Sequence, residues 1–236
     1  MKKIDWNKWI NWFVFGSLLI SIIFLITRVF LAPADKVLPY GRVKSDYLLM
    51  LSQCILGIIA MTLPGIFEHR FKITIPSKML IIYALFLYAA IFLGEVRSFY
   101  YTVNHWDTIL HTFSGAMLGA LGFSFVTLLN NTDRIPFNMS PIFVAIFAFC
   151  FGVTLGVFWE IYEFAFDGIL GLNMQKFSLE DGTQLIGRFA LKDSMKDLIV
   201  DALGAFIMSL IGYISLKYKK GWVDQLLLKK KNKVKN

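Results

Sequence analysis

One histidine and a set of acids stand at helical spacing within the apolar parts of the chain, and these are the residues best suited to chemistry. They fall into three groups, which are Asp107 with His111, Glu160 with Glu163, and Asp193 with Asp197 and Asp201. Residues three or four positions apart share one face of a helix, so each group points in one direction. Because lipid is the costly direction for a charge, we expect all the groups to face the interior of a helical bundle.

Carboxylates with an imidazole are the ligands of a divalent ion such as Mg²⁺, Mn²⁺ or Zn²⁺, and helical bundles build such sites from inward-facing Glu and His side chains. The expected ion ligands are His111, Glu160, Glu163, Asp197 and Asp201. Of these, Glu160 and Asp201 are also the candidate catalytic residues, because a carboxylate beside a bound ion can activate water. The expected supporting residues are Asp107, Asp193, Glu95 and Arg28.

The composition indicates that the helices that carry these residues lie in a lipid bilayer. Of the 236 residues, 57% are hydrophobic and 17% charged, and the mean hydropathy is +0.62. Soluble domains are about 45–50% apolar and about 25% charged, so this balance excludes most soluble enzyme classes. The 2 cysteines, Cys54 and Cys150, lie within apolar runs and have the spacing of neither a disulfide framework nor a zinc site.

Six stretches are apolar over about 20 residues, the length that crosses a bilayer as a helix. They cover residues 9–31, 47–67, 79–101, 107–129, 141–166 and 197–218. We therefore predict an all-α polytopic membrane protein, a bundle of six transmembrane helices that forms a single domain over residues 1–236. The first stretch resembles a signal peptide near Ala32-Pro33-Ala34, but its apolar run is too long for one, so we expect it to be retained.

The distribution of positive charge indicates how the bundle is oriented in the membrane. With the N-terminus inside, the inner side carries 15 Lys and Arg residues and the outer side carries 9. This bias predicts that both termini are cytoplasmic and that residues 219–236 form a basic cytoplasmic tail. Such a tail beside a span favours anionic membrane lipids as its partner, so the net charge of +8 does not indicate a nucleic-acid partner.

In this topology the acids converge on the outer side of the membrane. Successive helices run in opposite directions, so the start of the fourth span, the end of the fifth and the start of the sixth share one side, and the inner halves of the spans contain no acid. Like charges gathered in a low dielectric ionise together only when a cation joins them, and otherwise they share protons. Either outcome indicates a functional polar layer.

Other features of the outer side surround this polar layer. The connection 167–196 is long enough to be either an outer lid or a mobile loop. Tyr100, Tyr101 and Trp106 match an outer aromatic belt at the membrane surface. Arg28 is either a snorkelling residue at a helix end or a counter-ion to the acids.

Three blocks of the chain resemble known proteins. The blocks are WDTILHTF (106–113), FWEIYEF (158–164) and DSMKDLIVDALGA (193–205). They resemble the uncharacterised YjdF-like bacterial membrane proteins and, more distantly, the VanZ-like family, where Glu163 stands in place of a usual Gln and Asp201 in place of a usual Asn. The resemblance implies a multi-pass protein of the bacterial plasma membrane with an outer-leaflet polar site and a link to the cell envelope, and it implies no particular reaction.

Three functions fit these residues, and none of them requires a particular oligomeric state. The first is a metal-dependent hydrolase or transferase that acts on a lipid or lipid-linked envelope precursor at the outer leaflet. The second is a proton- or cation-coupled transporter that uses the same carboxylates as a relay, although no polar path continues through the inner half. The third is a non-catalytic assembly or regulatory protein of the envelope, whose buried acids pair with Arg28 and Arg97. We rank the enzyme first.

Overall fold

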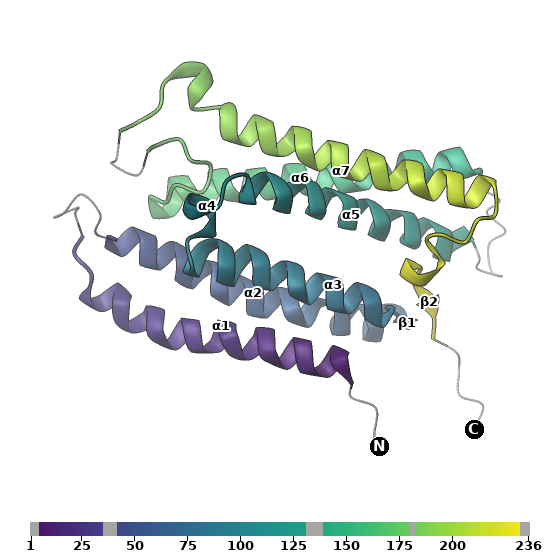
Figure 1. Cartoon of the computed structure of the whole chain (residues 1–236), viewed down its shortest axis with the longest axis horizontal. Coiled ribbons are helices and arrows are strands. Elements are labelled where there is room, and N and C mark those ends of the chain that lie inside the picture. The colour runs from purple at the N-terminus through teal and green to yellow at the C-terminus, as the bar shows by residue number, and fades with distance from the viewer. Residues whose placement is uncertain (1–4, 35–41, 131–138, 180–182, 232–236) are drawn as a thin grey trace.

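The computed structural model describes residues 5–34, 42–130, 139–179 and 183–231. Within them, six helices are long and apolar enough to cross a membrane, and they lie alongside one another (Figure 1). They are α1 (Trp6–Leu31), α2 (Lys44–Phe71), α3 (Ser77–Leu87) continued by the π-helix η1 (Tyr88–Val96), α5 (Trp106–Asn130), α6 (Pro141–Leu170) and α7 (Lys192–Lys217). The short elements are β1 (Ile73–Thr74), α4 (Phe99–Thr102), η2 (Gly187–Phe189), η3 (Asp224–Leu226) and β2 (Lys229–Lys230). The predicted all-α bundle with six candidate spans is confirmed.

Most of the long helices extend beyond the apolar stretches that predicted them, because local capping and polar first or last turns, and not hydropathy, set their ends. The side chain of Ser140 accepts a hydrogen bond from the backbone N–H of Phe143 and caps the start of α6. The same helix ends where Gly171 adopts the left-handed conformation. α7 begins at Lys192, before the predicted residue 197. Its first turn is polar, so hydropathy does not detect this part of the helix.

The third predicted span is the exception, since it ends early. α3 widens into the π-helix η1, which ends at Val96 and not at the predicted residue 101. Ser98 then adopts the left-handed conformation (φ 61°) and leads into α4, which folds Tyr100 back against Gly94. A Cβ atom at Gly94 would lie 2.4 Å from the Tyr100 ring, so this close approach needs glycine.

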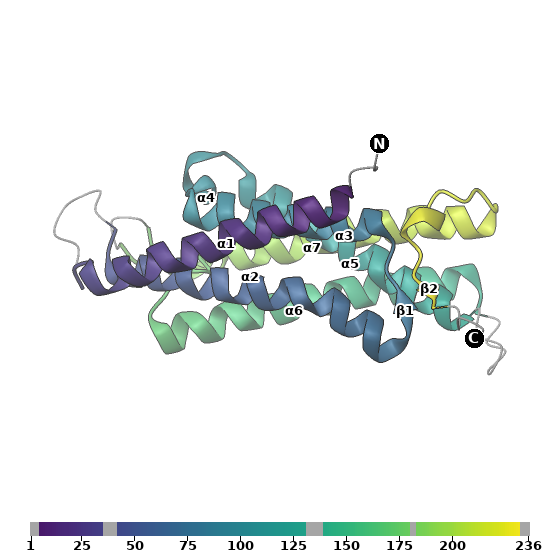
Figure 2. The same cartoon turned by 90° about the horizontal axis from the view of Figure 1, so that it is seen from below.

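The bundle has two halves, each with its own core (Figures 1 and 2). α1, α2 and α3 with η1 pack together around Val14, Leu18 and Cys54, which are fully buried. α5, α6 and α7 form the other half, in which Phe123 and Val144 are buried. The start of α5, the end of α6 and the start of α7 meet at one end of this second half, as helices of alternating direction must.

α5 and α7 approach each other very closely, and two glycines make this possible. A Cβ atom at Gly115 would lie 2.1 Å from the backbone oxygen of Asp201, and one at Gly204 would lie 2.1 Å from the backbone oxygen of Thr112. Small residues at a crossing allow membrane helices to come into backbone contact. This contact brings the acid-bearing starts of α5 and α7 together.

Residues 219–231 fold back across the opposite end of the bundle and do not form a free tail. β2 pairs in antiparallel fashion with β1, which follows α2. The backbone N–H of Leu228 donates a hydrogen bond to the hydroxyl of Ser124 on α5. The predicted tail is therefore, in this part, a folded connection between the two halves, and its last residues, 232–236, lie outside the described part of the chain.

Candidate functional site

His111, one turn into α5, lies between carboxylates of α5 and α7. Its Nδ1 is 3.2 Å from Oδ2 of Asp201. Its Nε2 is 3.7 Å from Oδ1 of Asp107 and 3.9 Å from Oδ2 of Asp197. Oδ1 of Asp201 accepts a hydrogen bond of 2.7 Å from the hydroxyl of Ser114, which holds that carboxylate in place. The imidazole therefore faces one acid with Nδ1 and two acids with Nε2.

Three of these residues are placed to hold one metal ion. One ligand atom each from Asp107, His111 and Asp197 lies within 4.8 Å of the others. A single ion can bridge such a group, since protein ligands lie at about 2.0–2.6 Å from zinc, magnesium or calcium. Asp197 is 2% exposed, and its Oδ1 has no hydrogen-bond partner among the described residues. A buried carboxylate oxygen without a partner costs free energy, which a bound cation would recover.

The acids of α6 lie outside that group of three. Glu160 is 6% exposed, and its Oε2 accepts a hydrogen bond of 3.3 Å from the side-chain amide of Gln175. Its Oε1 has no partner within the described residues. Glu163 accepts a hydrogen bond of 2.9 Å from the indole N–H of Trp159. These hydrogen bonds of both acids come from neutral donors.

The structure brings the predicted ligand set together in part. His111 and Asp197 belong to the group of three, and Asp107, expected only in support, is its third member. Asp201 stands on the Nδ1 side of His111. Asp193, the first acid of α7, pairs with a lysine from the loop before α7.

That lysine, Lys176, is the part of the site that the sequence pattern missed. Its ammonium group lies 2.5 Å from Oδ2 of Asp107 and 3.2 Å from Oδ2 of Asp193, and 5.5 Å from the centre of the Tyr100 ring. Burial disfavours the charged form, but the two carboxylates outweigh burial and raise the pKa of Lys176 above its usual value. Lys176 therefore stays charged at neutral pH and balances part of the acid cluster. A lone lysine in a loop carries no periodic signal that could have identified it.

The segment that carries Lys176, residues 172–178, is held against the bundle, and we call it the strap. The carboxylate of Asp167, near the end of α6, accepts hydrogen bonds from the backbone N–H groups of Met174 (2.7 Å) and Gln175 (3.0 Å). The side-chain amide of Gln175 also donates to the hydroxyl of Ser194 on α7 at 2.9 Å. The predicted lid or loop is thus, in this segment, an anchored strap beside the acids.

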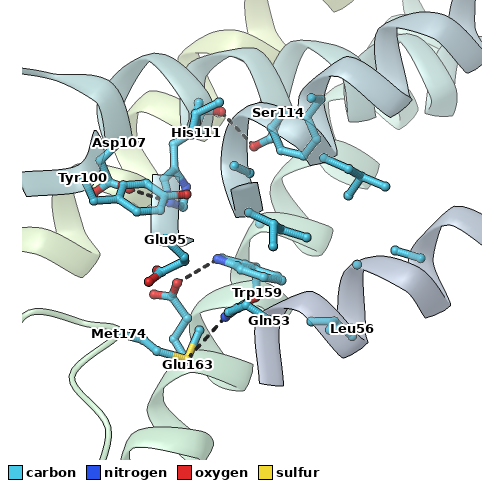
Figure 3. A pocket seen from close by; sticks show the side chains of 18 of the residues that line it. Gln53, Leu56, Glu95, Tyr100, Asp107, His111, Ser114, Trp159, Glu163 and Met174 are labelled. Carbon is cyan, nitrogen blue, oxygen red and sulfur yellow. Dashed lines mark hydrogen bonds and ion pairs between the residues drawn. The ribbon is translucent and has the colours of Figure 1, made fainter. Parts of the chain in front are cut away.

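Two of the expected supporting residues come from the N-terminal half. Arg28 donates a hydrogen bond of 2.8 Å to the hydroxyl of Tyr47 and lies over its ring, and in the described part of the chain it forms no ion pair. Glu95, on η1, extends into a cavity that Glu163 also lines (Figure 3). Tyr100 and Tyr101 line the same cavity, and the outer aromatic belt stays a prediction. Burial and the carboxylate of Glu95 raise the pKa of the Tyr100 hydroxyl.

The cavity has a volume of about 400 Å³ and lies between the two halves of the bundle. Asp107, His111 and Glu163 line it where the strap crosses (Figure 3), and much of its remaining lining is apolar. A concave, mostly apolar site with a few convergent polar groups is the usual form of a small-molecule site. Two of the three candidate ion ligands, Asp107 and His111, therefore line the polar end of a site of this form.

Fold and site together define a polytopic membrane protein with a buried cluster of acids and histidine at one end of its bundle. Residues 17–218 match a family described as predicted membrane protein (DUF2238), and the chain belongs to this family. An uncharacterised protein of Thermotoga maritima is similar, with 30% identity over 154 residues, which are 64% of this chain and 69% of that protein. No solved structure matches the chain. The YjdF-like and VanZ-like resemblances stay predictions.

Proposed function

We propose that this protein is a metal-dependent enzyme of the bacterial plasma membrane, a hydrolase or transferase that acts on a lipid or lipid-linked envelope precursor. Nε2 of His111 and the carboxylates of Asp107 and Asp197 would hold the divalent ion, Mg²⁺, Mn²⁺ or Zn²⁺. The proposal rests on one observation, the position of the imidazole between Asp201 on one nitrogen and the two other acids on the second nitrogen.

Asp201 supports this proposal through His111 and not as a ligand. A metal-ligating histidine almost always donates its other ring N–H to a carboxylate or carbonyl, which fixes the orientation of the ring. Asp201 lies 3.2 Å from Nδ1 of His111, and the hydroxyl of Ser114 holds Asp201 in turn. With the proton on Nδ1, the lone pair of Nε2 is free for an ion. We therefore assign Asp201 as a positioning residue.

Glu160 is the candidate general base of the proposed reaction. Its Oε1 is buried and has no partner within the described residues. A divalent ion held by Asp107, His111 and Asp197 would supply Lewis-acid chemistry, and Glu160 would accept the proton of the attacking water. The proton held by Glu160 would then pass to the leaving group as the attacked bond breaks. In a transferase, an acceptor hydroxyl would take the place of the water.

The two alternative functions have less support from the geometry. The assembly alternative requires acids paired with Arg28 and Arg97, whereas in the described residues the basic side chain that pairs with these acids is that of Lys176. The transport alternative requires a polar path toward the inner side. The deeper lining of the cavity is largely apolar, with residues such as Leu118. An enzyme with a fixed site at the outer end needs no such path.

Titration calorimetry tests the ion site. We expect the parent protein to bind Mn²⁺ or Zn²⁺, and Asp201→Asn to bind about 10–100-fold more weakly, because a neutral amide orients His111 less firmly. Glu160→Gln is the matched control, since it removes a buried acid outside the three ligands and should keep the parent affinity. Equal affinity of parent and Asp201→Asn, or no binding by the parent, contradicts the proposed site.

The envelope substrate also requires the site to lie on the outer side, with both termini inside. We expect Leu179→Cys to react with a membrane-impermeant maleimide in intact cells and Trp222→Cys to react only after lysis. Both positions are exposed. Cys150 is replaced by serine in both variants, whereas Cys54 is buried and stays. Reaction of Trp222→Cys in intact cells would put the site on the cytoplasmic side and exclude a substrate of the outer leaflet.

A further inference from the structure

The cavity between the two halves is long, and its chemistry changes along its length. On α5 its lining runs from Asp107 to Leu118, and on α2 it runs from Leu49 to Ala60. At a rise of 1.5 Å per residue, each of these paths covers roughly 16 Å. A volume of about 400 Å³ spread over that length makes the cavity an elongated channel, which can hold an extended hydrocarbon chain.

Apolar and aromatic side chains from both halves line the deeper part. α2 and α3 contribute Leu56, Tyr83 and Phe86, and α5 contributes Met117 and Leu118. Transfer of an apolar chain from water to such a lining is favourable in proportion to the area buried. The deep part therefore suits a hydrocarbon chain, and the cavity continues from it to Asp107 and His111 at the polar end.

The polar end carries more acids than bases. Glu95, Asp107, Glu163 and Asp201 line it, and the ammonium group of Lys176 is already shared by Asp107 and a second acid. These carboxylates repel an anion. A divalent ion held by three protein ligands reverses this preference, because it keeps an open coordination position that an oxygen of the substrate can fill.

We propose that the cavity binds an amphiphile with a hydrocarbon chain and a phosphate head. The chain lies between α2, α3 and α5, and a phosphate oxygen completes the coordination of the ion at His111. This inference rests on the proposed function, because the head binds through the ion. It adds the position of the hydrocarbon chain and the charge of the head. It also adds an order of binding, because the phosphate binds only after the ion.

The test uses the full chain in nanodiscs of zwitterionic lipid, with dodecyl phosphate as the probe. With Mn²⁺ present, dodecyl phosphate should raise the thermal midpoint above the value reached with Mn²⁺ alone. With a chelator present, it should have no effect. Inorganic phosphate, which lacks the chain, and dodecyl trimethylammonium, which has a cationic head, should each produce little or no shift.

Two variants that fill the deep part of the cavity locate the chain. Ala60→Phe and Leu118→Trp should each weaken dodecyl phosphate binding by about tenfold or more and leave Mn²⁺ affinity unchanged, because added side-chain volume takes the place of the chain. Ile59→Trp is the matched control, since Ile59 is the neighbour of Ala60 on α2 but is 53% exposed and is not one of the residues that line the cavity. If one filling variant does not fold, the other still gives the result.

The outcomes separate this inference from the proposed function. Mn²⁺ binding by the parent without any response to dodecyl phosphate overturns the inference and leaves the ion site standing. A response to dodecyl phosphate that persists in chelator, or a larger response to dodecyl trimethylammonium, overturns the ion-bound phosphate head. Unchanged dodecyl phosphate affinity in a folded filling variant overturns the position of the chain. Absence of Mn²⁺ binding by the parent removes the ion site itself, and the inference with it.

Discussion

His111→Ala should abolish the stabilisation of this protein by divalent ions and leave it folded. A ligand present at about 100 times its dissociation constant stabilises a fold by about 2.7 kcal/mol. The parent should show a corresponding rise in thermal midpoint with Mn²⁺ or Zn²⁺, because the three ligands are grouped within 4.8 Å. The variant lacks the nitrogen ligand and should show none. Thermal unfolding in detergent, with and without each ion, gives the comparison.

The ion-free behaviour separates a cation site from a structural lock. Asp197→Asn removes one negative charge from a group of acids and replaces an oxygen that has no partner among the described residues. Its midpoint without ions should therefore equal or exceed that of the parent, while its response to ions is lost. If the acids only pair with basic groups, removal of one partner costs about 3–5 kcal/mol. The control is His69→Ala. His69 lies in the last turn of α2, away from the acid cluster, so this variant should behave as the parent does.

Gly204→Ala should destabilise the protein strongly, whereas Gly168→Ala should not. A Cβ atom at Gly204 would lie 2.1 Å from the backbone oxygen of Thr112, so α5 and α7 have to move apart. Overpacking of this kind costs about 1–3 kcal/mol and occasionally more. Gly168, on α6, has nothing within 4 Å of its would-be Cβ, so alanine there should gain about 0.5–1 kcal/mol through helix propensity.

The glycine contact also links the fold to the site. Asp197 and Asp201 reach His111 only because α7 lies against α5, so separation of the two helices should remove the ion response together with stability. Thermal unfolding of Gly204→Ala and Gly168→Ala, each with and without Mn²⁺, measures both effects. Equal midpoints and equal ion responses in the two variants would show that the close crossing of α5 and α7 does not build the site.

Local properties of the chain account for the spans and for the end at which the acids gather. A run of about 20 apolar residues has to be helical in lipid, because no water is present to satisfy its backbone. The helical repeat places Asp107 beside His111 whatever the neighbouring helices are. The alternating direction of successive helices then brings the acid-bearing ends to one side. Hydropathy and helical spacing were therefore sufficient for the architecture and for the list of candidate acids.

The roles of the individual acids depended on how each helix is rotated about its own axis against its neighbours. Spacing along the chain predicted Asp197, Asp201 and Glu160 alike as ion ligands. The crossing of α5 and α7 directs Asp197 toward Nε2 of His111 and Asp201 toward Nδ1. One acid thereby becomes a candidate ligand and the other a positioning residue, a difference that the helical repeat does not contain.

Lys176 and Tyr100 show most clearly which features of the site only the tertiary structure decides. Neither lies in a helix that crosses the membrane. Lys176 lies in a loop and Tyr100 in the four-residue helix α4, and these segments are too short or too irregular for a repeat from which a direction could be inferred. Lys176 reaches Asp107 across 69 positions of the chain, and the hydrogen bonds of Asp167 hold the strap that makes this contact. Contacts between residues so distant in sequence form only when helices have packed, because packing sets the path of each connection.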